Sequence, residues 1–271
     1  MKNKLELENY LSKFGDISKL DRQILLKEMD SAWDDLGIDN TKQLSVQSDK
    51  VASYYSHPVW TLNGLYSELD PVSKGHRVSI ALYLQNLATK KIADYGGGSG
   101  VLAKLIAEKN PDSKIHIVEP FVSDFFQKRI KEINNIMYVS ELNAPYDVLI
   151  AQDVLEHVDD PIGLTLKLIE AVSNDGYLIF ANCFYPDIKC HLPSTFYLRH
   201  QFKNVVAKAG LTYLTNVPGA GHALVFQKTK VINYTAVMAA NKKAKILGSF
   251  INKFTTVAYR VKQVFKKNAG L

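Results

Sequence analysis

The sequence predicts an α/β protein with a Rossmann-like, doubly wound and mostly parallel seven-stranded sheet. Short apolar runs alternate with helical patterns between residues 91 and 228, as is typical of parallel strands joined by covering helices. A glycine-rich turn at residues 96–100 separates the first such run from the first helical pattern. The last two runs flank "PGAGH", which predicts a terminal antiparallel hairpin at one edge of the sheet.

The elements follow in a regular order. Strands are expected at 91–95, 114–120, 136–140, 146–151, 176–184, 211–217 and 223–228, and helices at 77–88, 99–110, 122–134, 161–173 and 195–210. Apolar residues at helical spacing predict that the first 50 residues are helical. The aromatic stretch at 53–77 contains two prolines and two glycines, which predicts a loop with short helices.

Three regions are therefore expected: an N-terminal helical lid at 1–89, a cofactor-binding domain at 90–230 and a C-terminal amphipathic helix at 231–271. No apolar run is long enough for a transmembrane helix, and acidic residues stand where a signal peptide needs an apolar stretch. The two cysteines, Cys183 and Cys190, do not make a disulfide framework. A cytoplasmic protein is the expectation.

Charge is distributed unevenly along the chain. From Ile188 to the end there are 14 Lys or Arg and no Asp or Glu, so the first 187 residues carry 19 basic against 27 acidic residues, a net charge of −8. The C-terminal part is therefore expected to be attracted to anions.

The glycine turn predicts a ligand that contains a nucleoside. Glycines allow positive φ and leave no Cβ in the way of a ligand, and the following helix offers free N–H groups. The next strand ends in Glu119, 19 residues after Gly100, a position from which an acid binds ribose hydroxyls. Asp94, two residues before the first glycine, would repel a pyrophosphate but suits a ligand with a cationic amine.

The motif "DYGGGSG", at residues 94–100, resembles the first motif of class I S-adenosylmethionine-dependent methyltransferases, D/E-x-G-x-G-x-G. "IVEPF" resembles their second motif, "YDVLIAQDVLEHVDDP" their fourth-strand motif and "GYLIFAN" their fifth strand. The element order is similar to theirs over about half the chain. "VLEHVDDP" resembles the small-molecule branch, which includes ubiquinone-type and sugar methyltransferases. A glycine-rich turn of another Rossmann-like nucleotide-binding domain is the alternative.

The resemblance implies S-adenosylmethionine as the cofactor and assigns its contacts. The glycine turn would pass beneath the methionine part, with Asp94 at the amino group and Glu119 at the ribose. Adenine would lie along Pro120 and Phe121, with Glu141 or Asn143 at its amine. Those two could equally be loop residues. The implied cofactor-binding residues are Asp94, Gly96, Gly97, Gly98, Gly100, Glu119, Pro120, Phe121, Glu141, Asn143, Gln152 and Asp153.

The expected activity is methyl transfer to a hydroxyl of a small-molecule or glycan-linked acceptor. Such a hydroxyl needs a base, and histidine suits that role near neutral pH. His157 and His191 follow the fourth and fifth strands and are the candidate catalytic residues; His222, in the hairpin turn, is a weaker one. N-methylation of an amino sugar or small amine is the second candidate function, and a non-catalytic cofactor-binding partner module is the third.

The lid is expected to contribute the acceptor-binding residues Tyr54, Tyr55, His57 and Trp60, because aromatic rings stack on sugars and other rings. Packing of these aromatics against the sheet is an equal alternative. No metal is expected, because the histidines lack a metal-binding spacing. The acids before Pro161 suit a helix N-cap instead.

The tail at 246–267 predicts a basic amphipathic helix. Apolar residues recur at three- and four-residue steps, and the basic residues lie off that stripe. The pattern favours a contact with the inner face of the membrane. A helix packed on its own domain and a homodimer contact are the alternatives; nucleic acid is not an expected partner.

Overall fold

The structure, a computed structural model, describes residues 2–87, 89–143 and 145–268, with side chains described between residues 5 and 252. Its helices are α1 (Lys2–Ser12), α2 (Arg22–Asp35), α3 (Ser48–Tyr55), α4 (Pro58–Leu69), α5 (Pro71–Gln85), α6 (Val101–Lys109), α7 (Asp124–Ile130), α8 (Pro161–Glu170), α9 (Phe202–Val206) and α10 (Tyr234–Asn268). Its strands are β1 (Lys91–Tyr95), β2 (Lys114–Val118), β3 (Ile136–Val139), β4 (Tyr146–Gln152), β5 (Val172–Ala181), β6 (Leu211–Val217) and β7 (Ala220–Lys228). Short 3₁₀ helices are η1 (Ile17–Lys19), η2 (Leu44–Gln47), η3 (Leu155–His157), η4 (Pro193–His200) and η5 (Ala207–Ala209).

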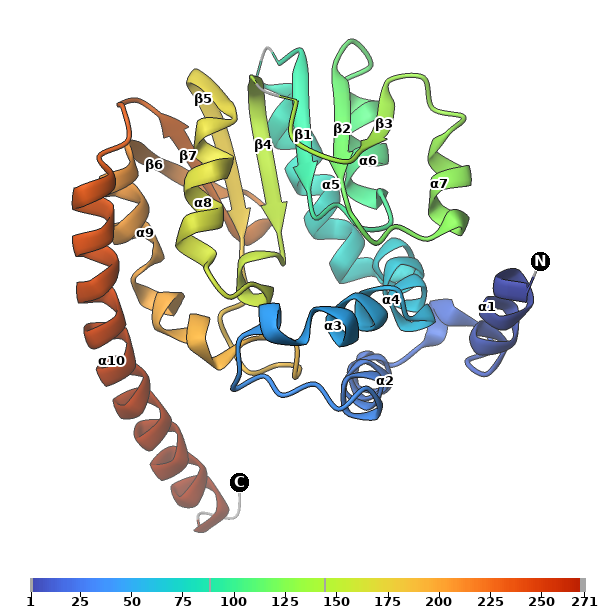
Figure 1. Cartoon of the computed structure of the whole chain (residues 1–271), viewed down its shortest axis with the longest axis horizontal. Coiled ribbons are helices and arrows are strands. Elements are labelled where there is room, and N and C mark those ends of the chain that lie inside the picture. Colours follow the sequence, from blue (N-terminus) through green and yellow to red (C-terminus); the bar gives the residue numbers. More distant parts are fainter. Residues whose placement is uncertain (1, 88, 144, 269–271) are drawn as a thin grey trace.

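The predicted sheet is confirmed. Seven strands lie in the order β3-β2-β1-β4-β5-β7-β6, parallel except for β7, which pairs antiparallel with both β5 and β6. The order reverses between β1 and β4, and ligands of open α/β sheets bind at the carboxyl ends of strands beside such a reversal. The helices α2, α3 and α4 lie across those ends (Figure 1).

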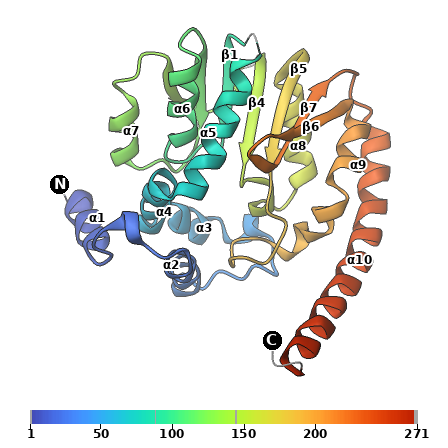
Figure 2. The ribbon, with the colours of Figure 1, turned by 180° about the vertical axis from the view of Figure 1, so that it is seen from behind.

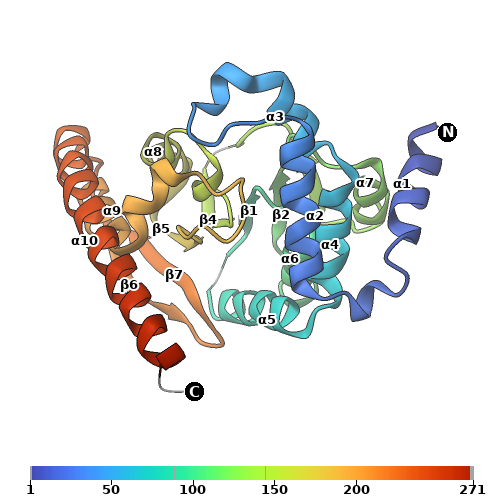
Figure 3. The ribbon, with the colours of Figure 1, turned by 90° about the horizontal axis from the view of Figure 1, so that it is seen from below.

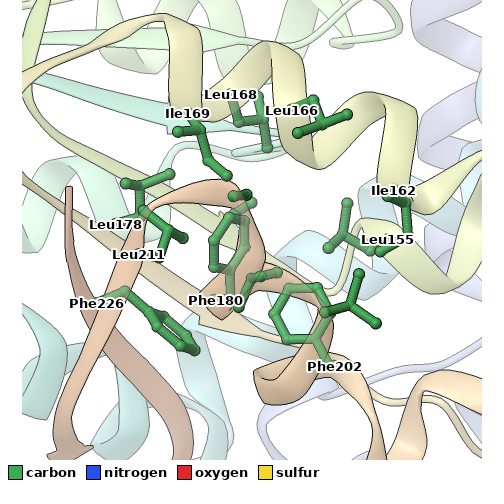
Figure 4. Close-up of a cluster of buried hydrophobic side chains, with 14 of the residues drawn as sticks. Leu155, Ile162, Leu166, Leu168, Ile169, Leu178, Phe180, Phe202, Leu211 and Phe226 are labelled. Carbon is green, nitrogen blue, oxygen red and sulfur yellow. The ribbon is translucent and has the colours of Figure 1, made fainter. Parts of the chain in front are cut away.

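Two apolar layers cover the sheet because alternate residues of a buried strand point to opposite faces. On β4, Leu149 and Ala151 pack with α8, α9 and α10, whereas Val148 and Ile150 pack with α5 and α6. Figure 2 shows α5 and α6 in front of the sheet, and Figure 4 shows the side chains of the first layer converging between β5, β7 and α8. The central strands β1 and β4 are therefore buried on both faces.

The stretch at 53–77 was expected to be a loop with short helices; the helices are present, but they leave almost no loop between them. Pro58 and Pro71 are the first residues of α4 and α5, with His57 and Asp70 as their N-caps. Proline is well tolerated at the first helical position, where its missing N–H would have no partner. The prolines therefore begin helices here instead of interrupting them.

Two helix boundaries also differ from expectation. Residues 172–173 belong to β5 and not to the preceding helix. The helix expected at 195–210 is divided into η4, α9 and η5. These segments still cover the sheet as the pattern predicts, since Leu198, Phe202 and Val206 are buried in the first apolar layer.

The beginning of α10 packs on the cofactor-binding domain. Val237 and Ala244 are buried, and Tyr197 donates a hydrogen bond to Asn241 Oδ1 at 2.7 Å. Ile246 and Phe250, from the predicted apolar stripe, are 67% and 61% exposed. The stripe from residue 253 onward lies outside the described side chains. The helix continues beyond the rest of the molecule, as the views from the front and from below show (Figures 1 and 3).

Candidate cofactor and acceptor site

The glycine turn carries three glycines with positive φ, Gly96, Gly98 and Gly100, at 70°, 48° and 74°. A Cβ on Gly97 would meet Asp94 Oδ2 at 2.5 Å. A Cβ on Gly98 would approach only the carbonyl oxygen of Gly96, at 4.0 Å. The turn is thus tightly packed at Gly97 and open at Gly98, so Gly98 is where a ligand can approach the backbone.

Asp94, the last residue but one of β1, is buried, and its Oδ2 has no hydrogen-bond partner in the described part of the chain. Burial raises the pKa of the Asp94 carboxyl to about 7, while the charge of Arg77 opposes that rise and the charge of Glu119 adds to it. An unpartnered buried carboxylate is costly. A cationic group of a ligand would relieve this cost.

Arg77, on α5, was not anticipated as a site residue. Burial lowers the pKa of its guanidinium, and the charges of Asp153 and Asp94 oppose that effect. Its Nη1 donates to the Ser73 hydroxyl at 2.6 Å and to the Ser73 carbonyl at 3.1 Å. No sequence motif marks Arg77 as a site residue, because only the fold brings it near Asp94.

Glu119 fixes the loop after β2 against the glycine turn. Its Oε2 accepts a hydrogen bond from the Gly98 N–H at 3.2 Å, and its Oε1 accepts one from the Phe121 N–H at 3.0 Å. Each oxygen keeps further acceptor capacity for a pair of hydroxyl groups. Tyr138, on β3, donates to the Gly98 carbonyl at 2.9 Å and closes the turn from the other side.

The end of β4 lies beside the end of β1, on the same side of the sheet. Asp153 has a positive φ of 53°, which turns the chain sharply after Gln152. Gln152 Oε1 and Asn182 Oδ1, the latter directly after β5, are buried and without a hydrogen-bond partner among the described residues. Together with Asp94 they form a row of unsatisfied polar groups at the carboxyl ends of β1, β4 and β5.

The two candidates for the adenine amine are exposed. Asn143 lies at the amino ends of the strands, opposite the glycine turn. Its N–H donates to the Tyr146 hydroxyl at 2.9 Å, and Lys91, at the start of β1, donates to its carbonyl oxygen. Asn143 is therefore not a cofactor residue. Glu141 is exposed on the connection from β3 to β4, and Pro120 is exposed beside the half-buried Phe121.

The two candidate catalytic histidines lie together. The ring centroids of His157 and His191 are 4.9 Å apart. The Nδ1 atoms of both rings hydrogen-bond to backbone carbonyls, those of Cys190 at 3.1 Å and Tyr185 at 2.7 Å. Burial, and then the charge of His191, lowers the pKa of His157 to about 3, and burial lowers the pKa of His191. Both imidazoles are therefore neutral near pH 7.

Glu156, directly before His157, belongs to the same cluster and was not assigned a role from the sequence. It is 0% exposed, and its Oε1 accepts a hydrogen bond from the Cys183 N–H at 2.6 Å. Burial and the nearby Asp153 charge raise the pKa of Glu156 to about 8. We call Glu156, His157 and His191 the Glu-His-His cluster.

The lid brings two of its four predicted residues to this cluster. Tyr55 and Trp60 lie edge-on to His157, with centroids 6.4 and 6.3 Å away. The Tyr55 hydroxyl and the Trp60 indole N–H are buried and have no hydrogen-bond partner in the described region. They can therefore donate to a bound molecule.

The other two lid residues have structural roles. Tyr54 is 1% exposed and packs edge-on against Trp33, with centroids 4.9 Å apart. The His57 Nδ1 accepts the Val59 N–H at 3.1 Å as the N-cap of α4, and its ring faces Tyr10. His222, on β7, lies against His76 with centroids 4.6 Å apart.

Of the two acids before Pro161, Asp160 acts as the predicted helix cap, whereas Asp159 binds another segment. Asp160 accepts the Gly163 N–H at 2.9 Å at the start of α8. Asp159 accepts the N–H groups of Leu44 and Ser45, at 2.8 and 3.0 Å, at the start of η2. Asp159 thereby fastens the lid to the domain.

These residues fit S-adenosylmethionine. The buried carboxylate of Asp94 suits its ammonium group, the open side of Gly98 admits its methionine part, and Glu119 offers two acceptor oxygens to its ribose. The fold and these residues together suit an α/β domain that binds a nucleoside-containing cofactor.

Residues 74–216 match the methyltransferase domain family, and the chain belongs to that family. The resemblance to class I S-adenosylmethionine-dependent methyltransferases is thereby confirmed, with S-adenosylmethionine as the family's cofactor.

Two curated relatives are similar over part of their length. The chain is 29% identical over 108 residues to a malonyl-[acyl-carrier protein] O-methyltransferase of Acetivibrio thermocellus, covering 37% of this chain and 38% of the relative. It is 23% identical over 158 residues to a ubiquinone biosynthesis O-methyltransferase of Erwinia tasmaniensis, covering 52% of this chain and 63% of the relative. The matches therefore span less than two thirds of either relative.

Solved structures share the fold. An O-methyltransferase family protein from Burkholderia thailandensis superposes with a TM-score of 0.52 at 14% identity, covering 78% of this chain and 70% of that chain. Human N-acetylserotonin methyltransferase, solved in complex with SAM, superposes with a TM-score of 0.52 at 16% identity, covering 77% and 65%. At these identities the likeness concerns the fold alone.

Proposed function

We propose that this protein transfers a methyl group from S-adenosylmethionine to a hydroxyl of a small-molecule or glycan-linked acceptor. The observation that carries the proposal is the row of buried, unsatisfied polar groups at the ends of β1, β4 and β5, directly beside the open glycine turn. Folded proteins rarely leave such groups unpaired, so a polar ligand is expected there. The O-methyltransferase names of the two curated relatives support a hydroxyl acceptor.

Bound S-adenosylmethionine would supply an activated methyl group, so the protein has mainly to bind and align. Asp94 would hold the cofactor's ammonium, Glu119 its ribose hydroxyls, and the Gly98 backbone would lie beneath it. The Phe121 ring stacks on Tyr55 with centroids 5.6 Å apart, which places the lid beside the cofactor's expected position. Closure of the lid would exclude water from the reacting atoms.

The acceptor would lie under the lid between the aromatic rings of Tyr55 and Trp60 and the Glu-His-His cluster. The Tyr55 hydroxyl and the Trp60 N–H would donate to its oxygen atoms. The proton of the reacting hydroxyl would leave toward the cluster, where His157 or His191 offers a neutral imidazole nitrogen. An amine acceptor needs no such base. Dependence of the rate on a histidine therefore distinguishes O-methylation from N-methylation.

Product analysis tests the proposal. Purified protein is incubated with S-adenosylmethionine and, in separate reactions, polyhydroxylated aromatics, hydroxylated sugars and amino sugars. S-Adenosylhomocysteine release with a methylated oxygen supports the proposal, and a methylated nitrogen supports the alternative. Tight cofactor binding with no turnover on any acceptor would favour the non-catalytic partner module.

We further propose that α10 contacts an anionic membrane surface. Within the described residues no helix is long and apolar enough to cross a bilayer. The support comes from the exposed Ile246 and Phe250 and from the 14 basic residues after residue 187 with no acid among them. An amphipathic basic helix of this kind lies in the plane of a membrane interface.

A further inference from the structure

The Glu-His-His cluster places three metal-ligating side chains together. One ligand atom from each of Glu156, His157 and His191 lies within 4.8 Å of the other two. Glu156 and His157 come from η3, after β4, and His191 comes from the segment after β5. Only the fold unites them, which is why the spacing along the sequence predicted no metal.

Both imidazoles are held as metal-binding histidines usually are. A backbone carbonyl can only accept, so the Nδ1 atoms that face Cys190 O at 3.1 Å and Tyr185 O at 2.7 Å carry the proton. In the neutral rings, Nε2 then has a free lone pair. A second-shell hydrogen bond of this type fixes the tautomer and orientation of a ligating histidine.

The carboxylate has one oxygen in use and one without a partner. Glu156 Oε1 accepts the Cys183 N–H at 2.6 Å, whereas Oε2 is buried and has no hydrogen-bond partner within the described chain. Glu156 is 0% exposed, so bulk water does not satisfy this oxygen. The cluster therefore gathers one carboxylate oxygen and two imidazole lone pairs, all acceptors.

We propose that Glu156, His157 and His191 bind a divalent transition-metal ion of the zinc class. Two imidazoles and a carboxylate are a ligand set that suits zinc and related first-row ions. Ligand distances of about 2.0–2.2 Å require the three side chains to close somewhat around the ion. Glu156, His157 and His191 would fill three of the four positions of a tetrahedral zinc ion, which would leave one position open.

The open position would face the aromatic rings of the lid, because Tyr55 and Trp60 lie edge-on to His157. A water molecule would fill it in the resting protein. If the protein methylates a hydroxyl as proposed above, the acceptor oxygen would take this position and lose its proton more readily. Only this last step rests on the proposed function.

The nearby thiols are not part of the ligand set. Among the described residues, the ligand atoms that lie within 4.8 Å of one another come from Glu156, His157 and His191, and this group includes neither Cys183 nor Cys190. Cys183 Sγ instead faces Asp187 Oδ2 at 3.7 Å. The competing explanation of the cluster is a proton on Glu156 that bonds to one imidazole, which requires no metal.

Metal titration of the tag-free, full-length protein distinguishes these explanations. After removal of metals with a chelator, Zn²⁺ is titrated in competition with a chromophoric chelator, and bound metal is counted by mass spectrometry. One tightly bound zinc per chain is expected. Co²⁺ should give the visible spectrum of a nitrogen- and oxygen-ligated site. Absence of stoichiometric binding at micromolar protein concentration would overturn the proposal and favour the shared proton.

Variants locate the site. Glu156→Gln keeps the acceptor for the Cys183 N–H but removes the charge, and His191→Gln removes an imidazole. Each should weaken zinc binding by more than the roughly 10–100-fold typical of losing an outer-shell partner. His200→Ala, at an exposed histidine that ends η4, is the matched control and should bind zinc as the unaltered protein does. Zinc affinity unchanged in both site variants would refute the assignment.

S-Adenosylmethionine affinity, measured on the same samples, reports whether each variant is folded. It also separates this proposal from the proposed function, because its contacts at Asp94, Gly98 and Glu119 lie outside the cluster. Should Glu156→Gln fail to fold, His157→Gln provides the second test.

Discussion

The Tyr55 ring stacks on the Phe121 ring, with centroids 5.6 Å apart and planes inclined by 21°. Tyr55 ends lid helix α3, and the N–H of Phe121 donates to Glu119 at 3.0 Å. The lid thus contacts the loop expected to bind the cofactor, and Tyr55 also lies edge-on to His157. One tyrosine therefore connects the two halves of the proposed active site.

Gly98→Leu should abolish S-adenosylmethionine binding while leaving a folded protein. Among the described residues, the Gly96 carbonyl oxygen alone lies within 4 Å of a Cβ built on Gly98, so the new side chain would occupy the space of the ligand. The positive φ adds strain of about 1–2 kcal/mol. Isothermal titration calorimetry measures the binding, and thermal unfolding measures the strain.

Gly15→Leu is the matched control for that variant. Gly15 also has positive φ, 60°, and nothing within 4 Å of a built Cβ, but it lies in the N-terminal region. It should show similar strain and normal cofactor affinity. Normal cofactor affinity in the Gly98 variant would place the ligand elsewhere.

Glu119→Ala should weaken S-adenosylmethionine binding by about 1–3 kcal/mol, the cost of losing charge-assisted hydrogen bonds. Part of this loss will come from the two hydrogen bonds that Glu119 accepts from the N–H groups of Gly98 and Phe121. Glu132→Ala, which removes an exposed carboxylate, should bind as the unaltered protein does. Equal affinities of the two variants, measured by calorimetry, would argue against a ribose contact.

S-Adenosylmethionine affinity should rise with pH through about 7. Burial raises the pKa of Asp94 to about 7, and an ammonium group pairs with the carboxylate but not with the neutral acid. Below that pH, affinity should fall by up to about tenfold per pH unit. Asp94→Asn should bind weakly and lack this part of the pH dependence; a retained slope would exclude Asp94 as its source.

The same shift affects the stability of the cofactor-free protein. The folded-state pKa lies above the ordinary value of 3.8, so the contribution of Asp94 is fully present below about pH 4. It is lost as pH rises from there to about 7. Denaturant unfolding of the protein and its Asp94→Asn variant should show their free-energy difference changing in that direction across this window.

His157→Ala and His191→Ala should differ from the unaltered protein in turnover more than in cofactor affinity. Loss of a positioned base typically lowers the rate by about 10²–10⁴-fold. The decisive measurement is turnover at saturating cofactor on a hydroxyl acceptor, with the exposed His200→Ala as the control. Near-normal turnover in both variants would favour an amine acceptor.

A chain shortened to end at Asn252 should lose binding to anionic vesicles and keep cofactor binding. It retains the part of α10 that packs on the domain, including Val237 and Asn241. Each basic residue near an anionic surface contributes on the order of 1 kcal/mol, screened by salt. Sedimentation with anionic and neutral vesicles at low and high salt measures this, and equal sedimentation of both chains would refute it.

The sheet and the glycine turn were predictable because local patterns encode them. Each of these patterns is local in the sequence: the periodicity of a strand, a run of glycines, or an acid directly after the second strand spans only a few residues. Asn143 was wrongly assigned to the cofactor site because the connection after β3 runs back to the amino ends of the strands. The composition of this connection does not reveal its course. Arg77 and Glu156 were missed because their roles arise from contacts between segments distant in the sequence.

The lid was the least predictable region for a related reason. Tyr54, Tyr55, His57 and Trp60 have the same aromatic character in the sequence, yet two of them face the site and two do not. Tyr54 and Tyr55 are consecutive residues at the end of α3 and therefore point in different directions, whereas His57 is the N-cap of α4 and Trp60 lies in its first turn. A proline-containing aromatic stretch reads equally well as a loop.

The way the lid is fastened determines when it can fold during synthesis. The apolar side chains of α2 and α4 pack with Cys190 and Leu192, and Asp30 accepts the N–H of Lys189 at 2.7 Å. At about 5–20 residues per second, the ribosome needs on the order of ten seconds to add residues 63–192. Throughout that interval the cluster of Leu25, Met29 and Trp33 lacks Cys190 and Leu192, so a chaperone that binds apolar helices early in synthesis could bind it then.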